Sequence, residues 1–227
     1  MKHRKQNNQQ FSTENIGHDN DETVCKRDLT LNLGFIAHTN TTLYFQELTQ
    51  IVAGTAINAR ATDLINCRGF KIKLLANCYG TEPHSFNYAI VSPRNSNTIN
   101  NADFFRGYDT NNTYLINAGG LFDATADINS DEYVVIKHNR VTIAERMAQT
   151  GNVNYGTLYG NKSCWYTKEL YVPINRQLRY ESALKTSCTT KIFIVYWFTN
   201  WMVGPSYTPT NFGAADIKAI MYFKDDG

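Results

Sequence analysis

The side chains that could do chemistry in this chain are mainly basic, in places that a nucleic acid could reach. Lys2, Arg4 and Lys5 lie in a polar, Gln/Asn-rich segment that cannot bury enough apolar surface to fold alone. Such a segment can neutralise phosphates without a fixed geometry. Other basic residues end this segment, flank a turn, or share one face of a strand pattern. The candidate nucleic-acid-binding residues are Lys2, Arg4, Lys5, Lys26, Arg27, Arg60, Arg68, Lys71 and Lys73.

The basic residues also have a simpler interpretation. The basic start could serve only as a solubilising tail, and exposed lysines on a sheet commonly discourage pairing with other sheet edges. The net charge of the whole chain is only +2. A nucleic-acid function must therefore depend on where the charges lie and not on their sum.

Aromatic residues form a second group of candidates. Tyr155 and Tyr159 lie in a loop that runs from Gly151 to Gly160. Such rings could stack on bases or sugars, or anchor a subunit interface, where tyrosine is enriched. We favour the interface, and we predict the same role for Phe104 and Phe105 in the Asn- and Gly-rich stretch 94–130.

The motifs of known enzymes and metal proteins would be a third group of candidates. The sequence contains no Gly-rich phosphate loop, no HExxH and no GxSxG, and its five histidines are scattered. Asp123, Asp127 and Asp131 recur every four residues, but the Gly and the terminal Glu of a calcium loop are missing. We therefore expect no enzyme activity, no cofactor and no metal site, and we interpret the aspartates as a solvated loop.

The elements that must position these residues are predicted to be strands. In 68–79, Phe70, Ile72 and Leu74 alternate with Lys71 and Lys73, which is the period of a half-buried strand. The apolar run 191–198 predicts a strand that is buried on both faces. Further strand patterns cover 29–35, 42–52, 85–91, 132–143, 165–174, 178–182 and 217–224. Eight or nine strands separated by short and very long loops predict an all-β sandwich or jelly roll.

The rest of the sequence indicates the cellular compartment that we expect for the protein. The start of the chain has no apolar stretch, and no segment reaches the roughly 20 apolar residues of a membrane span. The cysteines number five and form no CxxC pair. We therefore expect reduced thiols, some of them in the core, in an intracellular protein without a signal peptide or a membrane.

In order and spacing, several segments resemble one known family, the capsid proteins of small circular single-stranded DNA viruses (the circovirus-like group). The resemblance extends over roughly residues 42–224. The segments that carry it are Gly54–Arg60, Arg68–Leu74, Tyr133–Arg140, Leu178–Glu181, Ile192–Phe198 and Lys218–Lys224.

This resemblance implies a fold and a function. It implies an eight-stranded viral jelly roll, in which two antiparallel four-stranded sheets pack together and carry long loops. It also implies self-assembly into a closed icosahedral (T=1) shell of sixty copies around single-stranded DNA, in the virion and, during assembly, in the host nucleus. Residues 1–27 would be a flexible interior arm, and residues 28–227 the jelly-roll capsid domain.

The first 27 residues depart from that family, whose arm is long and Arg-rich. They hold five Lys/Arg against four Asp/Glu, a side-chain net charge of +1, so few counterions would be released on binding. Either part of a longer arm is missing, or an inner sheet face with Arg60, Arg68, Lys71 and Lys73 makes most genome contacts. The nuclear signal is also weak, because His3 interrupts the only basic cluster.

The alternative is a lectin-like, carbohydrate-binding β-sandwich. It would use aromatic side chains and Asn-rich loops to hold a sugar, with the spacing of Asp123, Asp127 and Asp131 suggesting calcium. It predicts a discrete subunit and calcium dependence. The basic start of the chain argues against it.

Overall fold

The protein folds as an all-β structure of eight strands. The computed structural model describes residues 25–39, 43–56, 58–78, 84–101, 103–106, 127–143, 165–181, 186, 188–200 and 211–225, and these contain no helix. The strands are β1 (Lys26–Thr39), β2 (Tyr44–Glu47), β3 (Leu64–Cys78), β4 (His84–Pro93), β5 (Tyr133–Ile143), β6 (Trp165–Arg179), β7 (Phe193–Asn200) and β8 (Asn211–Asp225).

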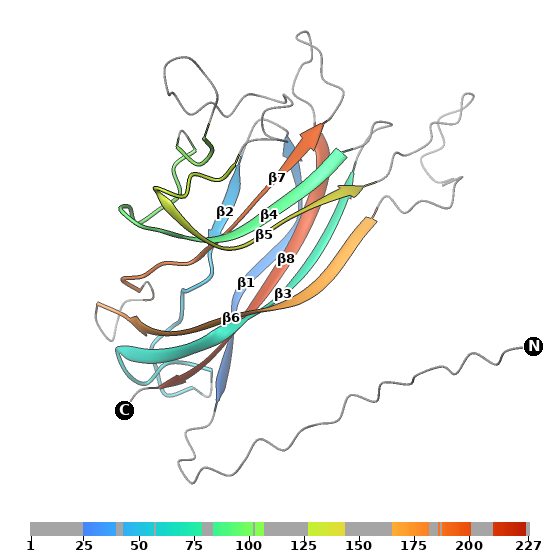
Figure 1. The fold of residues 1–227 in the computed structure, drawn as a ribbon. Coiled ribbons are helices and arrows are strands. Elements are labelled where there is room, and N and C mark those ends of the chain that lie inside the picture. The colour runs from blue at the N-terminus through green and yellow to red at the C-terminus, as the bar shows by residue number, and fades with distance from the viewer. Residues whose placement is uncertain are drawn as a thin grey trace, which may run out of the picture.

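The strands form two antiparallel four-stranded sheets, which pack face to face as two layers (Figure 1). One has the order β1-β8-β3-β6 and the other the order β2-β7-β4-β5. Only β4 and β5 are neighbours both in sequence and in a sheet, because most connections cross from one sheet to the other. This interleaved order is a jelly roll, so the predicted fold class is confirmed.

Alternating side chains explain why each strand faces the core as it does. On β3, Phe70, Ile72 and Leu74 are buried, whereas Lys71 and Lys73 point to the other side. This is the period-2 pattern that the sequence predicts. The inner faces of the two sheets meet in one apolar core, which includes Phe86, Tyr88, Tyr196, Phe198, Met221 and Phe223.

The strand β7 is buried on both faces, as its apolar sequence predicts. Ile194, Tyr196 and Phe198 point into the core between the sheets. Val195 and Trp197 point outward into a second apolar cluster. That cluster covers the outer side of the sheet β2-β7-β4-β5, with Ile99, Phe104, Phe105, Ile128 and Tyr133 packed over it.

The bounds of several strands differ from their predictions, β2 being much shorter than the predicted 42–52 and β1 and β8 longer than predicted, and one predicted pair of strands is a single strand. The sequence predicts two separate strands at 165–174 and 178–182, but β6 runs through from Trp165 to Arg179. Its pairing with β3 shifts register between Gly69↔Pro173 and Cys67↔Arg176, which is a β-bulge. Asn175 lies in this bulge with φ 48°, a left-handed conformation that asparagine tolerates. The residues between the two predicted strands therefore form a bulge within one strand.

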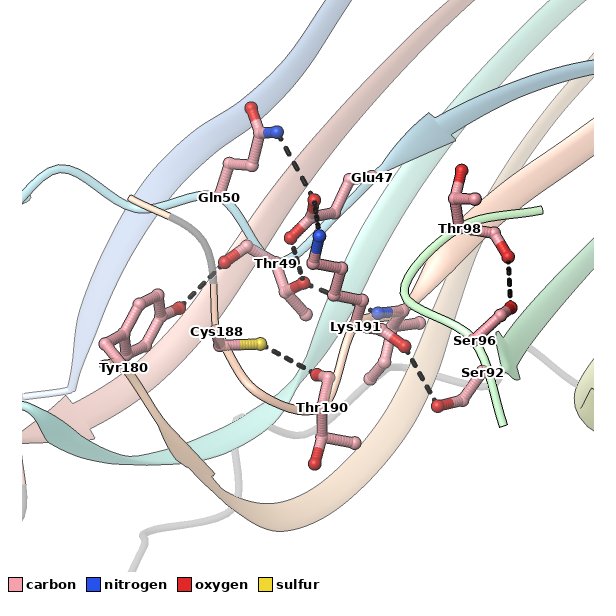
Figure 2. Close-up of polar contacts among 11 residues, drawn as sticks. Glu47, Thr49, Gln50, Ser92, Ser96, Thr98, Tyr180, Cys188, Thr190 and Lys191 are labelled. Atoms are coloured by element: carbon pink, nitrogen blue, oxygen red, sulfur yellow. Dashed lines mark hydrogen bonds and ion pairs between the residues drawn. The ribbon is translucent and has the colours of Figure 1, made fainter. Parts of the chain in front are cut away.

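A polar network closes one end of the sandwich, where β2 ends and β7 begins (Figure 2). The hydroxyl of Thr49 donates to Glu47 at 3.0 Å, and Thr49 Oγ1 accepts from the backbone N–H of Ile192 at 3.4 Å. Tyr180 donates its hydroxyl to the carbonyl oxygen of Thr49 at 2.8 Å, and Lys191 Nζ lies 3.9 Å from Glu47 Oε2. These contacts satisfy buried polar groups at the place where the chain passes between the sheets.

Candidate nucleic-acid interface

The outward side of the sheet β1-β8-β3-β6 carries a mixed basic and aromatic surface. We call it the lysine face. In one cross-strand row Lys71 lies between Ile220 of β8 and Tyr171 of β6. In the next row Lys73 lies between Lys218 and Glu169. The members of the lysine face are Arg27, Leu29, Arg68, Lys71, Lys73, Glu169, Tyr171, Asp216, Lys218, Ile220, Tyr222 and Lys224.

The charges of the lysine face favour an anionic partner, because its basic residues outnumber its two carboxylates. The second of these rows lines a shallow depression of about 350 Å³, to which Lys168 and Asp216 also contribute. The neighbouring charges are close enough to interact at ordinary ionic strength. A phosphate at this surface would therefore meet several ammonium groups at once.

Glu169 pairs with the two lysines of β3. Lys71 Nζ lies 2.6 Å from Glu169 Oε1, and Lys73 Nζ lies 3.4 Å from Glu169 Oε2. The hydrogen bond from Lys71 lowers the pKa of Glu169, and the same bond raises the pKa of Lys71. All three side chains are at least a third exposed, so water and salt weaken these ion pairs. The lysines can thus exchange the carboxylate for another anion.

Tyr171 is the most exposed aromatic residue of the lysine face, at 54%. The hydroxyl end of its ring lies over Gly69, where an added Cβ would be 2.8 Å from the Tyr171 oxygen and 2.9 Å from Cζ. The ring of Tyr222 meets it edge to face, with centroids 6.1 Å apart. Burial raises the pKa of Tyr171, and the nearby charge of Arg68 opposes that rise. The ring is therefore held down on the sheet and is still open to solvent.

The other predicted nucleic-acid-binding residues have different environments. Arg27 pairs across β1 and β8 with Tyr222 and so belongs to the lysine face. Lys26 forms an ion pair with Asp225 and donates to the carbonyl oxygen of Ala59 at 3.0 Å. It therefore helps to hold the end of β1. Lys2, Arg4 and Lys5 lie outside the described residues.

Arg60 does not fit its predicted role, and the structure corrects it. Its side chain is only 1% exposed, and its guanidinium lies 4.2 Å from the centroid of the Tyr180 ring. It donates to the carbonyl oxygen of Thr62 at 2.8 Å and to Asp63 Oδ1 at 3.0 Å. Because it is enclosed by the fold, Arg60 cannot reach a phosphate, and it acts as a structural residue.

Phe104 and Phe105 are corrected in the same way. They are 0% and 1% exposed, and their ring centroids lie 5.9 Å and 5.1 Å from that of Trp197. They therefore belong to the second apolar cluster and leave no side-chain surface for another subunit. The other two predicted interface residues, Tyr155 and Tyr159, lie outside the described residues.

Sequence reasoning missed Glu169, Tyr171, Lys218 and Tyr222 as parts of the lysine face. The alternation in β3 predicts the face to which Lys71 and Lys73 point, but it does not predict that β6 and β8 lie beside them. Gly69 was the one available signal, because a glycine within a strand often marks a bulge or the close approach of another group. Its partner Tyr171 is about a hundred residues away in the sequence.

Acidic residues and buried thiols are the other candidate centres within the described residues. Asp131 forms an ion pair with Arg106, Asp123 lies outside the described part, and no group of three potential metal ligands occurs within it. Burial raises the pKa of the thiols of Cys67 and Cys188 to about 12 and about 11, so both are protonated at neutral pH. Neither thiol is thus suited to be a nucleophile. In the described ranges, no helix has the length and apolar character to span a membrane.

No protein-family model matches the chain, and no curated protein matches its sequence at a significant level. Function must therefore be inferred from the fold and from the lysine face. A jelly roll alone does not fix a function, because the same fold carries coat proteins, lectins and enzymes. The chemistry of the exposed residues has to distinguish them.

Proposed function

We propose that this chain is the capsid subunit of a small single-stranded DNA virus, which assembles into a closed shell and packages the genome. The observation that carries the proposal is the combination of a jelly roll, with sheet orders β1-β8-β3-β6 and β2-β7-β4-β5, and the lysine face on one of its sheets. The jelly roll is the architecture that the sequence resemblance implies. The lysine face on one of the two sheets supports the packaging part of the proposal.

Packaging requires contacts that do not depend on the genome sequence. Phosphate contacts provide them, because every nucleotide carries the same charge. Arg27, Arg68, Lys71, Lys73 and Lys218 are spread over all the strands of the sheet except β6. In the proposed shell, the lysine face lines the interior, and it offsets the weak charge of the first 27 residues.

The proposed assembly is a T=1 shell of sixty copies. The long connections within 94–130 and 144–163, with Tyr155 and Tyr159, stay the predicted place of subunit contacts. Because Phe104 and Phe105 pack inside the subunit, they are left out of that interface. The proposed location is the virion, with assembly in the host nucleus and an unidentified receptor.

The lectin-like alternative is kept for one observation, since the exposed ring of Tyr171 would also suit a sugar. The calcium site that this alternative requires is less favoured, because Asp131 forms an ion pair with Arg106. The surrounding lysines favour a phosphate over a neutral saccharide.

The experiment is size-exclusion chromatography with light scattering and ultraviolet spectra on the purified chain. The proposal expects a megadalton particle that contains nuclease-resistant nucleic acid. A particle without nucleic acid would support the shell and contradict packaging by this chain. A small oligomer that is insensitive to salt and concentration would overturn the capsid proposal, and a calcium-dependent rise in Tm would then favour the lectin.

A further inference from the structure

We propose that Tyr171 is a stacking platform for a base of single-stranded nucleic acid, and that Glu169 occupies the adjoining phosphate site of Lys71 and Lys73 until the strand displaces it. This deepens the proposed function and depends on it for its biological meaning. The site itself can be tested whether or not the chain forms a shell.

The first step is the geometry of the ring. Tyr171 lies against Gly69 and makes a T-shaped contact with the ring of Tyr222, and more than half of its surface remains open. A base needs a flat, immobile ring with a free face, and aromatic stacking accepts any base. Any larger residue than glycine at position 69 would push the ring away. The absence of a side chain there thus makes the platform possible.

The second step is the position of the charges. Lys71 lies directly across from Tyr171 in the antiparallel pair β3–β6, where facing Cβ atoms are about 5 Å apart. Lys73 and Lys218 form the next row. A nucleotide whose base rests on Tyr171 would therefore carry its phosphate within reach of Lys71 or Lys73.

The third step concerns Glu169. Its carboxylate already bridges the two ammonium groups, at 2.6 Å and 3.4 Å. A phosphate that enters replaces one anion by another, and the exposed carboxylate turns into solvent. Glu169 thus lowers the affinity for nucleic acid without blocking the site. Such a competitor keeps lysines paired in the empty subunit and makes binding reversible during assembly.

The fourth step is the choice of partner. Duplex DNA hides the faces of its bases, so it could use the lysines but not the ring. An acidic peptide would likewise bind the lysines alone. A second copy of this chain would bury Tyr171 together with Leu29, which is 52% exposed on the same face. The combination of a basic row with an open, braced ring favours a single strand.

The test compares the full-length chain with Tyr171→Leu and Tyr171→Phe. Binding of a fluorescent oligothymidylate is followed by anisotropy, next to an abasic strand of equal length. Tyr171→Leu is expected to weaken thymidylate binding at least about fivefold. Tyr171→Phe should keep the affinity, and neither variant should alter abasic binding. Where the chain is isolated as a closed shell, the shells are dissociated and reassembled with each strand, and the captured amount is measured.

The second arm uses Glu169→Gln, with Glu132→Gln before β5 as the control. Glu169→Gln should tighten binding and steepen its salt dependence, because the ion pairs that it removes compete with the strand most strongly at low salt, where they are least screened. Glu132→Gln should change neither quantity. Unchanged thymidylate affinity in Tyr171→Leu, or equal losses with abasic and intact strands, would overturn the platform. Unchanged salt dependence in Glu169→Gln would overturn the competitor.

The oligomeric state of each variant separates this inference from the proposed function. A small oligomer that still stacks thymidylate would contradict the shell and retain the site. A normal shell whose Tyr171→Leu variant captures wild-type amounts of both strands would contradict the site alone. Loss of assembly in Tyr171→Leu without nucleic acid would assign the lysine face to a contact between copies and overturn the inference.

Discussion

Gly69 and Tyr171 form one structural unit, since a Cβ on Gly69 would lie 2.8 Å from the Tyr171 hydroxyl oxygen and 2.4 Å from the carbonyl oxygen of Val172. The contact joins β3 and β6 at the bulge where their register shifts. It also sets the height at which the Tyr171 ring lies above the sheet. The pair therefore links the local backbone to the proposed base platform.

The first prediction concerns this glycine. Gly69→Ala should destabilise the fold by about 1–3 kcal/mol, because the new methyl group meets backbone as well as the ring. Gly34→Ala on β1 is the matched control, because nothing lies within 4 Å of its added Cβ. Denaturant unfolding of both variants measures the difference. Equal free energies of unfolding for Gly69→Ala and Gly34→Ala would mean that β3 and β6 move apart easily at the bulge.

The second prediction concerns Arg60. Arg60→Ala should lower the free energy of unfolding by about 2 kcal/mol or more, because it removes a desolvated cation–π contact with Tyr180. Arg68→Ala, at an exposed site, should change it by no more than about 0.5 kcal/mol. Thermal unfolding gives the comparison. Nucleic-acid affinity should respond in the opposite order, falling for Arg68→Ala and not for Arg60→Ala.

The contrast between Arg60 and Arg68 shows which features of the fold could be predicted from the sequence and which could not. The alternation of Phe70 and Lys71, and the apolar run of β7, predicted which faces are buried, because strand period is a local property. The burial of Arg60 depends on its contact with Tyr180, and the burial of Phe104 depends on its contact with Trp197. Both partners are distant in the sequence. The register that places Tyr171 beside Lys71 is set by the whole sheet. These relationships could not be predicted from short segments.

The third prediction tests the second apolar cluster. Phe104→Ala should destabilise the isolated subunit by about 3–5 kcal/mol, because a fully buried ring is removed next to Trp197. Val52→Ala is the control, because Val52 is 62% exposed. Unfolding should be measured under conditions where the subunit is dissociated. A variant that folds normally but fails to assemble would return Phe104 to the subunit interface.

The fourth prediction is a loss of stability at alkaline pH. Burial raises the thiol pKa of Cys67 to about 12 and of Cys188 to about 11 from a reference of 9.0. Above about pH 9 the unfolded chain releases these protons and the folded chain keeps them, so stability falls until the folded pKa values are passed. The slope is at most about 1.4 kcal/mol per pH unit for each group.

Cys67→Ala should reduce that alkaline slope, although it also lowers stability at neutral pH. At pH 8 a thiol reagent should modify exposed Cys25 in the folded protein and spare the two buried cysteines. Rapid modification of Cys67 without unfolding would contradict the burial that underlies the prediction.

The last prediction compares the two proposed sources of packaging charge. Replacing Lys2, Arg4 and Lys5 by Ala should reduce packaged nucleic acid less than the double change Lys71→Ala and Lys73→Ala. The first 27 residues have a net charge of only +1, so their acidic part offsets the basic start, whereas the lysine face concentrates several cations on one rigid sheet. Both variants should still form shells, as measured by light scattering with ultraviolet spectra. Empty shells from the tail variant, with full shells from the lysine variant, would reverse the assignment and make the start of the chain the main binding element.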